Sequence, residues 1–201
     1  MKKYLFSAFL LFGLFFLSSQ AAALTISPAK IIISGDPGDT IETEMRIGND
    51  LDKTTTFYPV FEGYTVRDGE EPIFYPKDFG LPTWIETIPS TLTVGPKETK
   101  SAVIKINVPE DAAPGGHYAV IFWSTAPPKQ KGGSGVGIVT RVGALTFLEI
   151  SGEITEEAEI LDFKATKKFV RNLPIGFGFA FYNKGNVHLR PEGEVVIKNI
   201  W

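Results

Sequence analysis

Short stretches in which apolar and polar residues alternate cover most of the chain after residue 23. At residues 41–47, isoleucine and methionine take turns with charged and polar side chains. Alternation with a period of two places one face of a β-strand on a core and the other in water. Further strands are predicted at residues 24–34, 54–66, 91–94, 100–108, 117–125 and 139–150, with a short edge strand at Trp84 and Ile85.

Clusters of turn-forming residues separate these strands. Glycine, proline and acidic residues gather at residues 35–39, 48–50, 95–98 and 109–116. Between residues 70 and 90 four prolines exclude long strands. Seven to eight short strands in about 127 residues, with turns at near-regular spacing, predict an immunoglobulin-like β-sandwich. We therefore expect an all-β fold class, with this sandwich at residues 24–152.

Residues 153–201 are predicted to form a second β unit. Its strands are expected at residues 158–165, 175–182 and 193–200, with a turn that begins at Asn183. Three strands cannot close a two-sheet sandwich. We interpret this unit as an incomplete second immunoglobulin-like domain, and we expect membrane contact only through an anchor beyond Trp201.

Residues 1–23 have the three-part layout of a secretory signal peptide. Lys2 and Lys3 precede an uncharged, mostly apolar run at residues 4–17, and small residues follow it. This layout predicts a signal helix that is cleaved after Ala23, with Ala21 and Ala23 read at the cleavage site. An uncleaved anchor is the alternative, although the run is shorter than the roughly 20 residues of a spanning helix. We expect an exported protein at a bacterial cell surface, in a periplasm or outside the cell.

The composition excludes several kinds of chemistry. The 201 residues include no cysteine, so disulfides, thiolate metal sites, a lipoprotein anchor and a cysteine nucleophile are ruled out. Without Lys2 and Lys3 the chain carries 18 basic and 23 acidic residues, a formal charge of −5. This negative charge argues against electrostatic binding of nucleic acid or anionic lipid over a broad surface. His117 and His188 are isolated and no Gly-x-Ser-x-Gly elbow occurs, so we expect neither an enzyme nor a cofactor.

Three polar clusters have a functional interpretation beside an ordinary structural one. Acidic residues in turns are candidate Ca²⁺ ligands, but none matches a 12-residue calcium loop, and Asp is an ordinary turn former. These residues are Asp36, Asp39, Asp50, Asp52, Asp68, Glu70 and Glu71. Glu156, Glu157 and Glu159 have no partner acid for glycoside hydrolysis, which favours an exposed linker. The glycine-rich run at residues 132–137 meets no phosphate-loop motif and is expected to be a hairpin loop, or a mobile recognition loop.

Aromatic side chains provide the candidate binding surface. It comprises Phe57, Tyr58, Tyr64, Phe74 and Tyr75. Phe57 and Phe61 share parity on one strand and should face the same side. Most such side chains belong to a core, and an exposed remainder can stack on sugar rings or pack on a protein partner.

The order of the turn motifs resembles the first domain of the WxL-interacting-protein-like family of bacterial surface proteins. The motifs are Ser27-Pro28, Pro37-Gly38-Asp39-Thr40, Leu92-Thr93-Val94-Gly95-Pro96-Lys97-Glu98, Val108-Pro109 and Pro114-Gly115-Gly116-His117-Tyr118. The order is similar, more distantly, to the immunoglobulin-like first domain of periplasmic pilus chaperones. The resemblance implies that the first domain binds peptidoglycan or another wall component and that a second domain binds a partner. A membrane helix near the C-terminus is typical of that family and does not occur in these 201 residues.

These observations favour an exported, non-enzymatic surface protein that binds a cell-wall polymer or another surface protein. A secreted chaperone-like subunit that completes β proteins by strand addition is the first alternative. Such a chaperone needs a basic anchor for a client's carboxylate, and Arg171 and Lys184 are available. An accessory domain of a larger exported enzyme is the second alternative.

Overall fold

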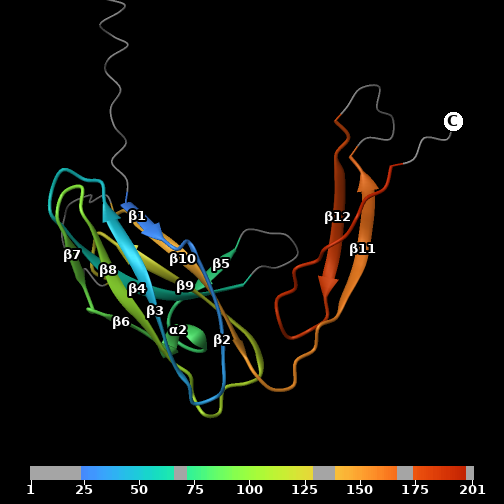
Figure 1. Ribbon diagram of the computed structural model, residues 1–201, viewed down its shortest axis with the longest axis horizontal. Helices are drawn as coiled ribbons and strands as arrows, with labels where there is room; N and C mark the ends of the chain where they lie inside the picture. The colour runs from blue at the N-terminus through green and yellow to red at the C-terminus, as the bar shows by residue number, and fades with distance from the viewer. Residues whose placement is uncertain (1–23, 66–71, 129–138, 167–173, 198–201) are drawn as a thin grey trace, which may run out of the picture.

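The computed structural model describes residues 24–65, 72–128, 139–166 and 174–197 (Figure 1). Within these ranges the chain forms β1 (Leu24–Ser27), β2 (Lys30–Gly35), β3 (Thr40–Asn49), β4 (Thr55–Thr65), β5 (Ile73–Tyr75), α2 (Leu81–Trp84), β6 (Ile85–Ile88), β7 (Leu92–Val94), β8 (Thr99–Asn107), β9 (Gly115–Ser124), β10 (Arg141–Ile150), β11 (Ala158–Ala165) and β12 (Phe177–Asn183). The predicted signal helix, including Ala21 and Ala23, lies outside the described residues.

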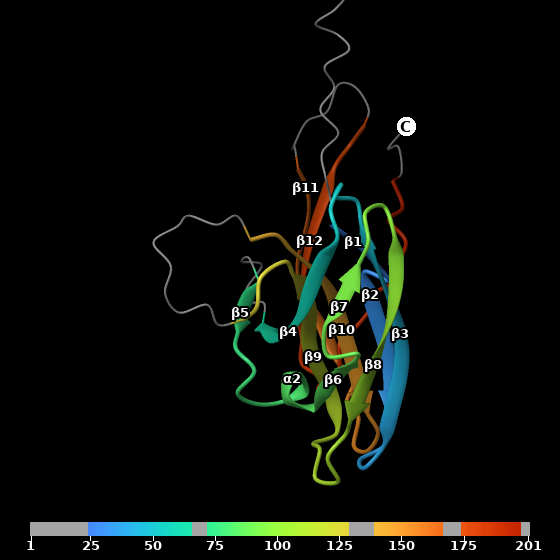
Figure 2. The ribbon, with the colours of Figure 1, turned by 90° about the vertical axis from the view of Figure 1, so that its left-hand side faces the viewer.

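Strands β1 to β10 form two sheets that face each other as the layers of a sandwich (Figures 1 and 2). The first sheet has the order β1-β3-β8-β6, and all its pairs are antiparallel. The second has the order β2-β10-β9-β4-β5, and β7 also pairs with β4. In it β2 runs parallel to β10, and the other pairs are antiparallel. This arrangement confirms the predicted immunoglobulin-like, all-β fold.

The first strand region divides between the two sheets. The sequence predicts one strand over residues 24–34, whereas the structure has β1 in the first sheet and β2 in the second. The chain crosses between the sheets at Pro28, which lacks the N–H that would continue a ladder. As a result, β2 begins at Lys30 and covers only part of β10.

The core lies between the sheets, and the predicted alternation accounts for it. Met45 and Ile104 from the first sheet meet Phe57 and Trp123 from the second, and all four side chains are fully buried. The indole N–H of Trp123 donates to the sulfur of Met45 over 3.2 Å, so its polar group is satisfied inside the core.

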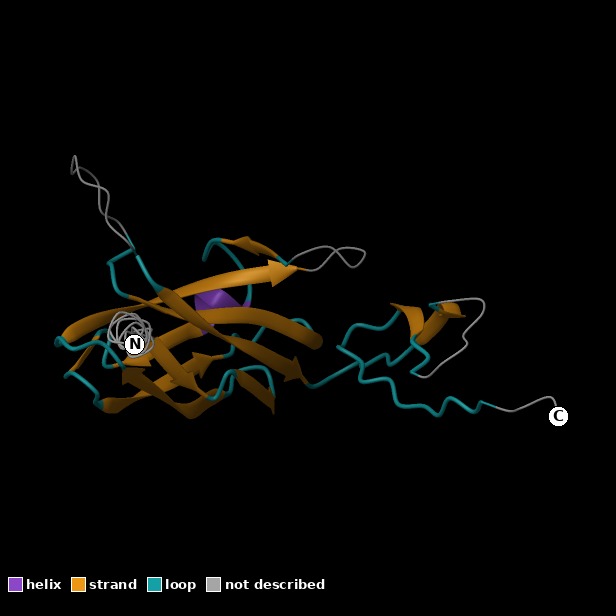
Figure 3. Ribbon diagram, turned by 90° about the horizontal axis from the view of Figure 1, so that it is seen from above, coloured by secondary structure: helices purple, strands orange, loops and turns teal. Residues whose placement is uncertain are grey.

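Beyond the sandwich, β11 and β12 form an antiparallel hairpin (Figures 1 and 3). We call β11, β12 and residues 183–197 the hairpin unit. The strand predicted at residues 193–200 is wrong for its described part, because residues 193–197 form no strand. Alternation in sequence supplies a strand pattern, but a strand also needs a neighbouring backbone for its hydrogen bonds. Residues 191–195 instead run over the apolar side of the hairpin, and residues 198–200 lie outside the described residues.

Candidate functional site

The predicted aromatic surface divides into a core residue and residues on opposite faces of one sheet. Phe57 is 0% exposed, so assigning it to a binding surface is wrong: its parity on β4 points it inward. Tyr58 and Tyr64 have the opposite parity on β4 and face outward. Phe74 on β5 pairs with Tyr64 on β4 and so lies on the same outer face. Tyr75 pairs with Gly63, so it lies on the other face of β5. Binding by Tyr58, Tyr64, Phe74 and Tyr75 remains a prediction.

An aromatic cluster covers the outer face of the second sheet. The outer aromatic cluster consists of Tyr64, Phe74, Tyr118, Phe122, Phe147 and His188. Its rings meet edge to face or tilted, as the Tyr118–Phe147 pair does at 5.7 Å between ring centroids. The predicted strand at residues 117–125 is apolar on both faces, which is typical of a strand covered on both sides. That signal could have revealed Tyr118 and Phe122 from the sequence, but their partners come from distant segments.

Two cations border the outer aromatic cluster. The Lys30 ammonium lies 4.3 Å from the ring centroid of Phe147, and the Arg141 guanidinium lies 4.3 Å from that of Phe122. Arg141 also donates to the carboxylate of Glu62 over 2.9 Å. Cations over aromatic faces are attracted by the negative face of the ring. Arg141 is therefore held at the start of β10 with part of its side chain still exposed.

Burial in this cluster affects two phenols. Desolvation raises the pKa of Tyr64, and the nearby Tyr118 adds to the rise. Desolvation also raises the pKa of Tyr118, with a further rise from Glu149, while a hydrogen bond with the backbone of His188 lowers it. Both phenols therefore stay protonated above their ordinary range.

The turn after β12 joins the hairpin unit to the sandwich. The side chain of Asn186 accepts from the N–H of Thr155 over 2.8 Å and donates to the carbonyl of Glu153 over 2.8 Å. Val187 is buried, and the ring of His188 lies 5.0 Å from that of Phe147. A turn predicted only as a connection between strands therefore also forms the contact between the two units.

Nearly half of one edge of β10 has no hydrogen-bonded strand among the described residues. β2 pairs with residues 145–150 of β10, and residues 141–144 pair only with β9 on the other side. The N–H of Leu145 donates to the carbonyl of Ala29 over 3.0 Å, so residue 145 points its backbone groups toward β2. Alternation along an antiparallel strand then turns the backbone groups of Arg141 and Gly143 toward the same, unpaired edge. We call residues 141–144 the free half of β10.

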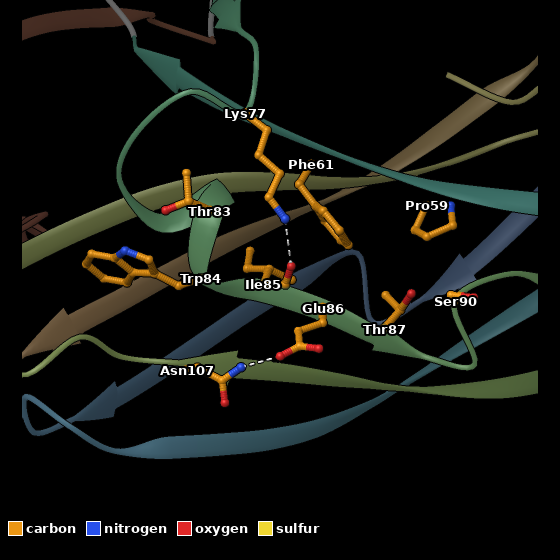
Figure 4. A pocket seen from close by; sticks show the side chains of 10 residues that line it. All are labelled: Pro59, Phe61, Lys77, Thr83, Trp84, Ile85, Glu86, Thr87, Ser90 and Asn107. Atoms are coloured by element: carbon orange, nitrogen blue, oxygen red, sulfur yellow. Dashed lines mark hydrogen bonds between the residues drawn. The ribbon is translucent and has the colours of Figure 1, made fainter. Parts of the chain in front are cut away.

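A cavity of about 460 Å³ opens between the sheets at the β4 and β6 side (Figure 4). It is lined by Pro59, Phe61, Lys77, Thr83, Trp84, Ile85, Glu86, Thr87, Ser90 and Asn107. The ammonium of Lys77 donates to the carbonyl of Ile85 over 3.1 Å and lies 4.7 Å from the ring centroid of Phe61. The amide of Asn107 donates to the carboxylate of Glu86. Desolvation lowers the pKa of Lys77, and the charge of Glu86 raises it in part.

Among the acidic turn residues that the structure describes, the carboxylates of Asp36, Asp39 and Asp52 have structural partners. The carboxylate of Asp39 accepts from the N–H of Asp36 over 2.8 Å, which closes a turn. Asp52 lies 3.2 Å from Lys97. No group of three or more histidine and acidic residues within metal-binding reach occurs in the described ranges. Asp68, Glu70 and Glu71 lie outside them.

The remaining candidate residues are held by neighbours. Lys184 pairs with Glu159 at 2.7 Å and with Glu157 at 3.9 Å. His117 donates from Nε2 to the carbonyl of Ala113 over 2.8 Å and lies against the ring of Trp84. Arg171 and the glycine-rich run at residues 132–137 lie outside the described residues. None of the helices in the described ranges has the length and apolar character that crossing a membrane requires.

Comparison with known proteins finds similarity in structure alone. No protein-family model matches the chain, and no curated protein matches it in sequence. The chain is similar to a class 5 fimbriae chaperone, CfaA, with 13% identity, a TM-score of 0.49, and coverage of 82% of this chain and 68% of that one. It is also similar to a chain of the Salmonella enterica SafA pilin–SafB chaperone complex, with 8% identity, a TM-score of 0.46, and coverage of 83% of this chain and 85% of that one. A third similar structure is a chain of the CsuC–CsuE chaperone–tip adhesion subunit complex of Acinetobacter baumannii, with 13% identity, a TM-score of 0.46, and coverage of 82% of this chain and 78% of that one.

Proposed function

We propose that this chain is an exported, non-enzymatic protein of the bacterial envelope that binds an extended segment of another exported protein. The free half of β10 is the observation that carries the proposal. Arg141 and Gly143 present backbone donors and acceptors there without a strand paired to them in the described residues. An added strand would satisfy these groups, and its alternate side chains would meet the two faces of the sheet.

The surroundings of the free half of β10 favour a protein segment. On the outer face, an added strand would lie next to Arg141, whose guanidinium lies over the ring of Phe122 and supplies a positive charge. Gly143 lets the side chains of Phe122 and Val120 pack over its backbone, because a Cβ there would meet them at 2.6 and 2.7 Å. The layout of residues 1–23 supports export, and a partner would be met in the same compartment.

Peptide binding tests this proposal. The probe is the capped decapeptide Lys-Thr-Val-Thr-Val-Thr-Val-Thr-Val-Lys, followed by NMR chemical shifts and amide hydrogen exchange. We expect slowed exchange at the amides of Arg141 and Gly143. Arg141→Pro removes one of these N–H groups and should weaken binding about fivefold relative to Arg141→Ala, which loses the same side chain but keeps the N–H. Binding that protects neither amide, or equal affinities of the two variants, would contradict the proposal.

Binding of a wall polymer is the second candidate, favoured by the cavity between the sheets. Trp84 supplies a ring for stacking, and Lys77, Glu86 and three hydroxyl side chains supply hydrogen-bonding groups around it. The resemblance to the WxL-interacting-protein-like family adds the wall as the place of binding. Sedimentation with purified peptidoglycan tests this function, and Trp84→Ala should reduce the bound fraction while Arg141→Pro leaves it unchanged.

A further inference from the structure

One face of the β11–β12 hairpin is apolar and exposed. Cross-strand pairing places Ile160 opposite Phe181, Phe163 opposite Phe179, and Ala165 opposite Phe177, so these side chains share a face. Ile160 is 73% exposed, Phe179 60% and Phe163 52%. We call Ile160, Phe163, Phe177, Phe179 and Phe181 the hairpin apolar face. A contiguous exposed patch of large apolar residues marks an interaction surface.

The charged side chains of the hairpin lie on its other face. Asp162 pairs with Lys164 at 2.6 Å, and both residues have the parity opposite to that of the hairpin apolar face. Glu159 lies opposite Tyr182 on this second face, where it pairs with Lys184. The two strands are therefore amphipathic, with uncharged strand side chains on one face and paired charges on the other.

A hairpin of two strands needs a covering layer to be stable. An isolated two-stranded hairpin is marginally stable at best in water, and packing against another layer is the usual remedy. Residues 191–195 cover only part of the hairpin apolar face and leave a cavity of about 440 Å³, lined by Ile160, Phe163, Phe179 and Phe181. The side chains of Val195 and Ile197 extend the exposed apolar surface, at 52% and 64% exposure.

We propose that the hairpin apolar face packs against the same face of a second copy of this chain. A buried aromatic side chain covers about 150–250 Å², so five side chains that are about half exposed offer about 500 Å² per copy. Two copies would bury about 1,000 Å², which is near the lower limit for a specific interface. The area therefore fits a homodimer of modest affinity.

The chemistry of the face also suits a symmetric contact. A two-fold interface brings identical patches together, so any charge within the patch would meet a like charge. The five residues of the hairpin apolar face carry no charge, and the ion pairs of the hairpin lie on its other face. Glu192 and Glu194 line the cavity beside this face, so the two-fold contact must leave both carboxylates at its solvent-exposed rim. Two such sheets can stack at about 10 Å with interdigitated side chains, as in a β-sandwich. This inference is independent of the free half of β10, which belongs to the other unit.

Sedimentation of the purified chain over a range of concentrations tests the homodimer. Phe179→Glu places a charge at the centre of the face and should weaken self-association at least about 30-fold, as the loss of a central aromatic anchor does. Tyr182→Glu is the matched control, because Tyr182 is a similarly exposed aromatic residue on the same strand but on the other face. The control should associate like the unchanged chain.

Hydrogen exchange of the unchanged chain provides a second measurement that needs no variant. Protection of β11 and β12 should rise with protein concentration while protection of β3 and β8 stays constant. A monomer at all concentrations, or equal loss of association in Phe179→Glu and Tyr182→Glu, would overturn the proposal. Concentration-independent protection of β11 and β12 would overturn it as well.

Discussion

The backbone N–H of Gly116 in the sandwich donates to the backbone carbonyl of Asn186 in the hairpin unit over 2.8 Å. Gly115, beside it, has a φ of 113°, and a Cβ there would meet the same carbonyl at 2.7 Å. The start of β9 therefore approaches the turn closely because glycine leaves room for it. The two bonds of the Asn186 side chain hold the same turn to the linker between β10 and β11. The contact with Gly116 and the bonds to the linker together hold the hairpin unit at one end of the sandwich.

Replacement of Asn186 should loosen this junction. Asn186→Ala removes a side-chain acceptor for Thr155 and a donor for Glu153, so we expect the free energy of unfolding to fall by about 1–3 kcal/mol. Urea unfolding measures this loss. Lys184→Ala on the same turn is the control and should cost less than about 1 kcal/mol, because its ion pairs are exposed. Equal losses in the two variants would show that Asn186 does not hold the junction.

Two neighbouring aromatic residues on β4 should differ sharply in their effect on stability. Phe57→Ala leaves a cavity in the core and should lower the free energy of unfolding by about 3–5 kcal/mol. Tyr58→Ala, on the outer face, should lower it by about 1 kcal/mol or less. Chemical denaturation compares the two variants, and similar losses would contradict the inward placement of Phe57.

Alkaline pH should weaken the fold through two tyrosines. Burial raises the pKa of Tyr64 and Tyr118, so the folded chain keeps these protons at a pH where the unfolded chain has lost them. The free energy of unfolding should therefore fall as the pH rises above about 10, the ordinary pKa of tyrosine. Ultraviolet titration of the phenols should show two that ionise after the rest. Tyr64→Phe and Tyr118→Phe should each remove one late step, and a titration without late steps would count against the outer aromatic cluster.

Lysine titration should separate Lys77 from Lys164. Desolvation lowers the pKa of Lys77, whereas the hydrogen bond and charge of Asp162 raise the pKa of Lys164. NMR of labelled lysine side chains should show Lys77 losing its proton first. Glu86→Gln removes the charge that favours the ammonium of Lys77, so it should lower the pKa of Lys77 further and leave Lys164 unchanged. An upward shift of Lys77 in this variant would contradict the geometry of the cavity.

Alternation along the chain was sufficient to predict most strands and the shared face of Phe57 and Phe61 on β4. This success follows from a local rule, because the period of two fixes which side chains share a face. The same rule predicts a single strand where the structure has β1 and β2, because a local pattern does not say which sheet a strand joins. It also predicts a strand at residues 193–200, because alternation is present there without a neighbouring backbone to pair with.

The candidate sites depended on tertiary structure to a much larger extent. Sequence composition singled out Tyr64 and Phe74, but their contacts with Tyr118, Phe147 and His188 arise where β4, β5, β9, β10 and the turn after β12 converge. The free half of β10 exists only because the chain changes sheets at Pro28, and a pairing between distant strands has no local signature. The sequence by itself determined the all-β class and the exclusion of cysteine chemistry, since these follow from periodicity and composition. Strand partners, open edges and clusters on a face were decided only by the tertiary structure, because they are relations between segments far apart along the chain.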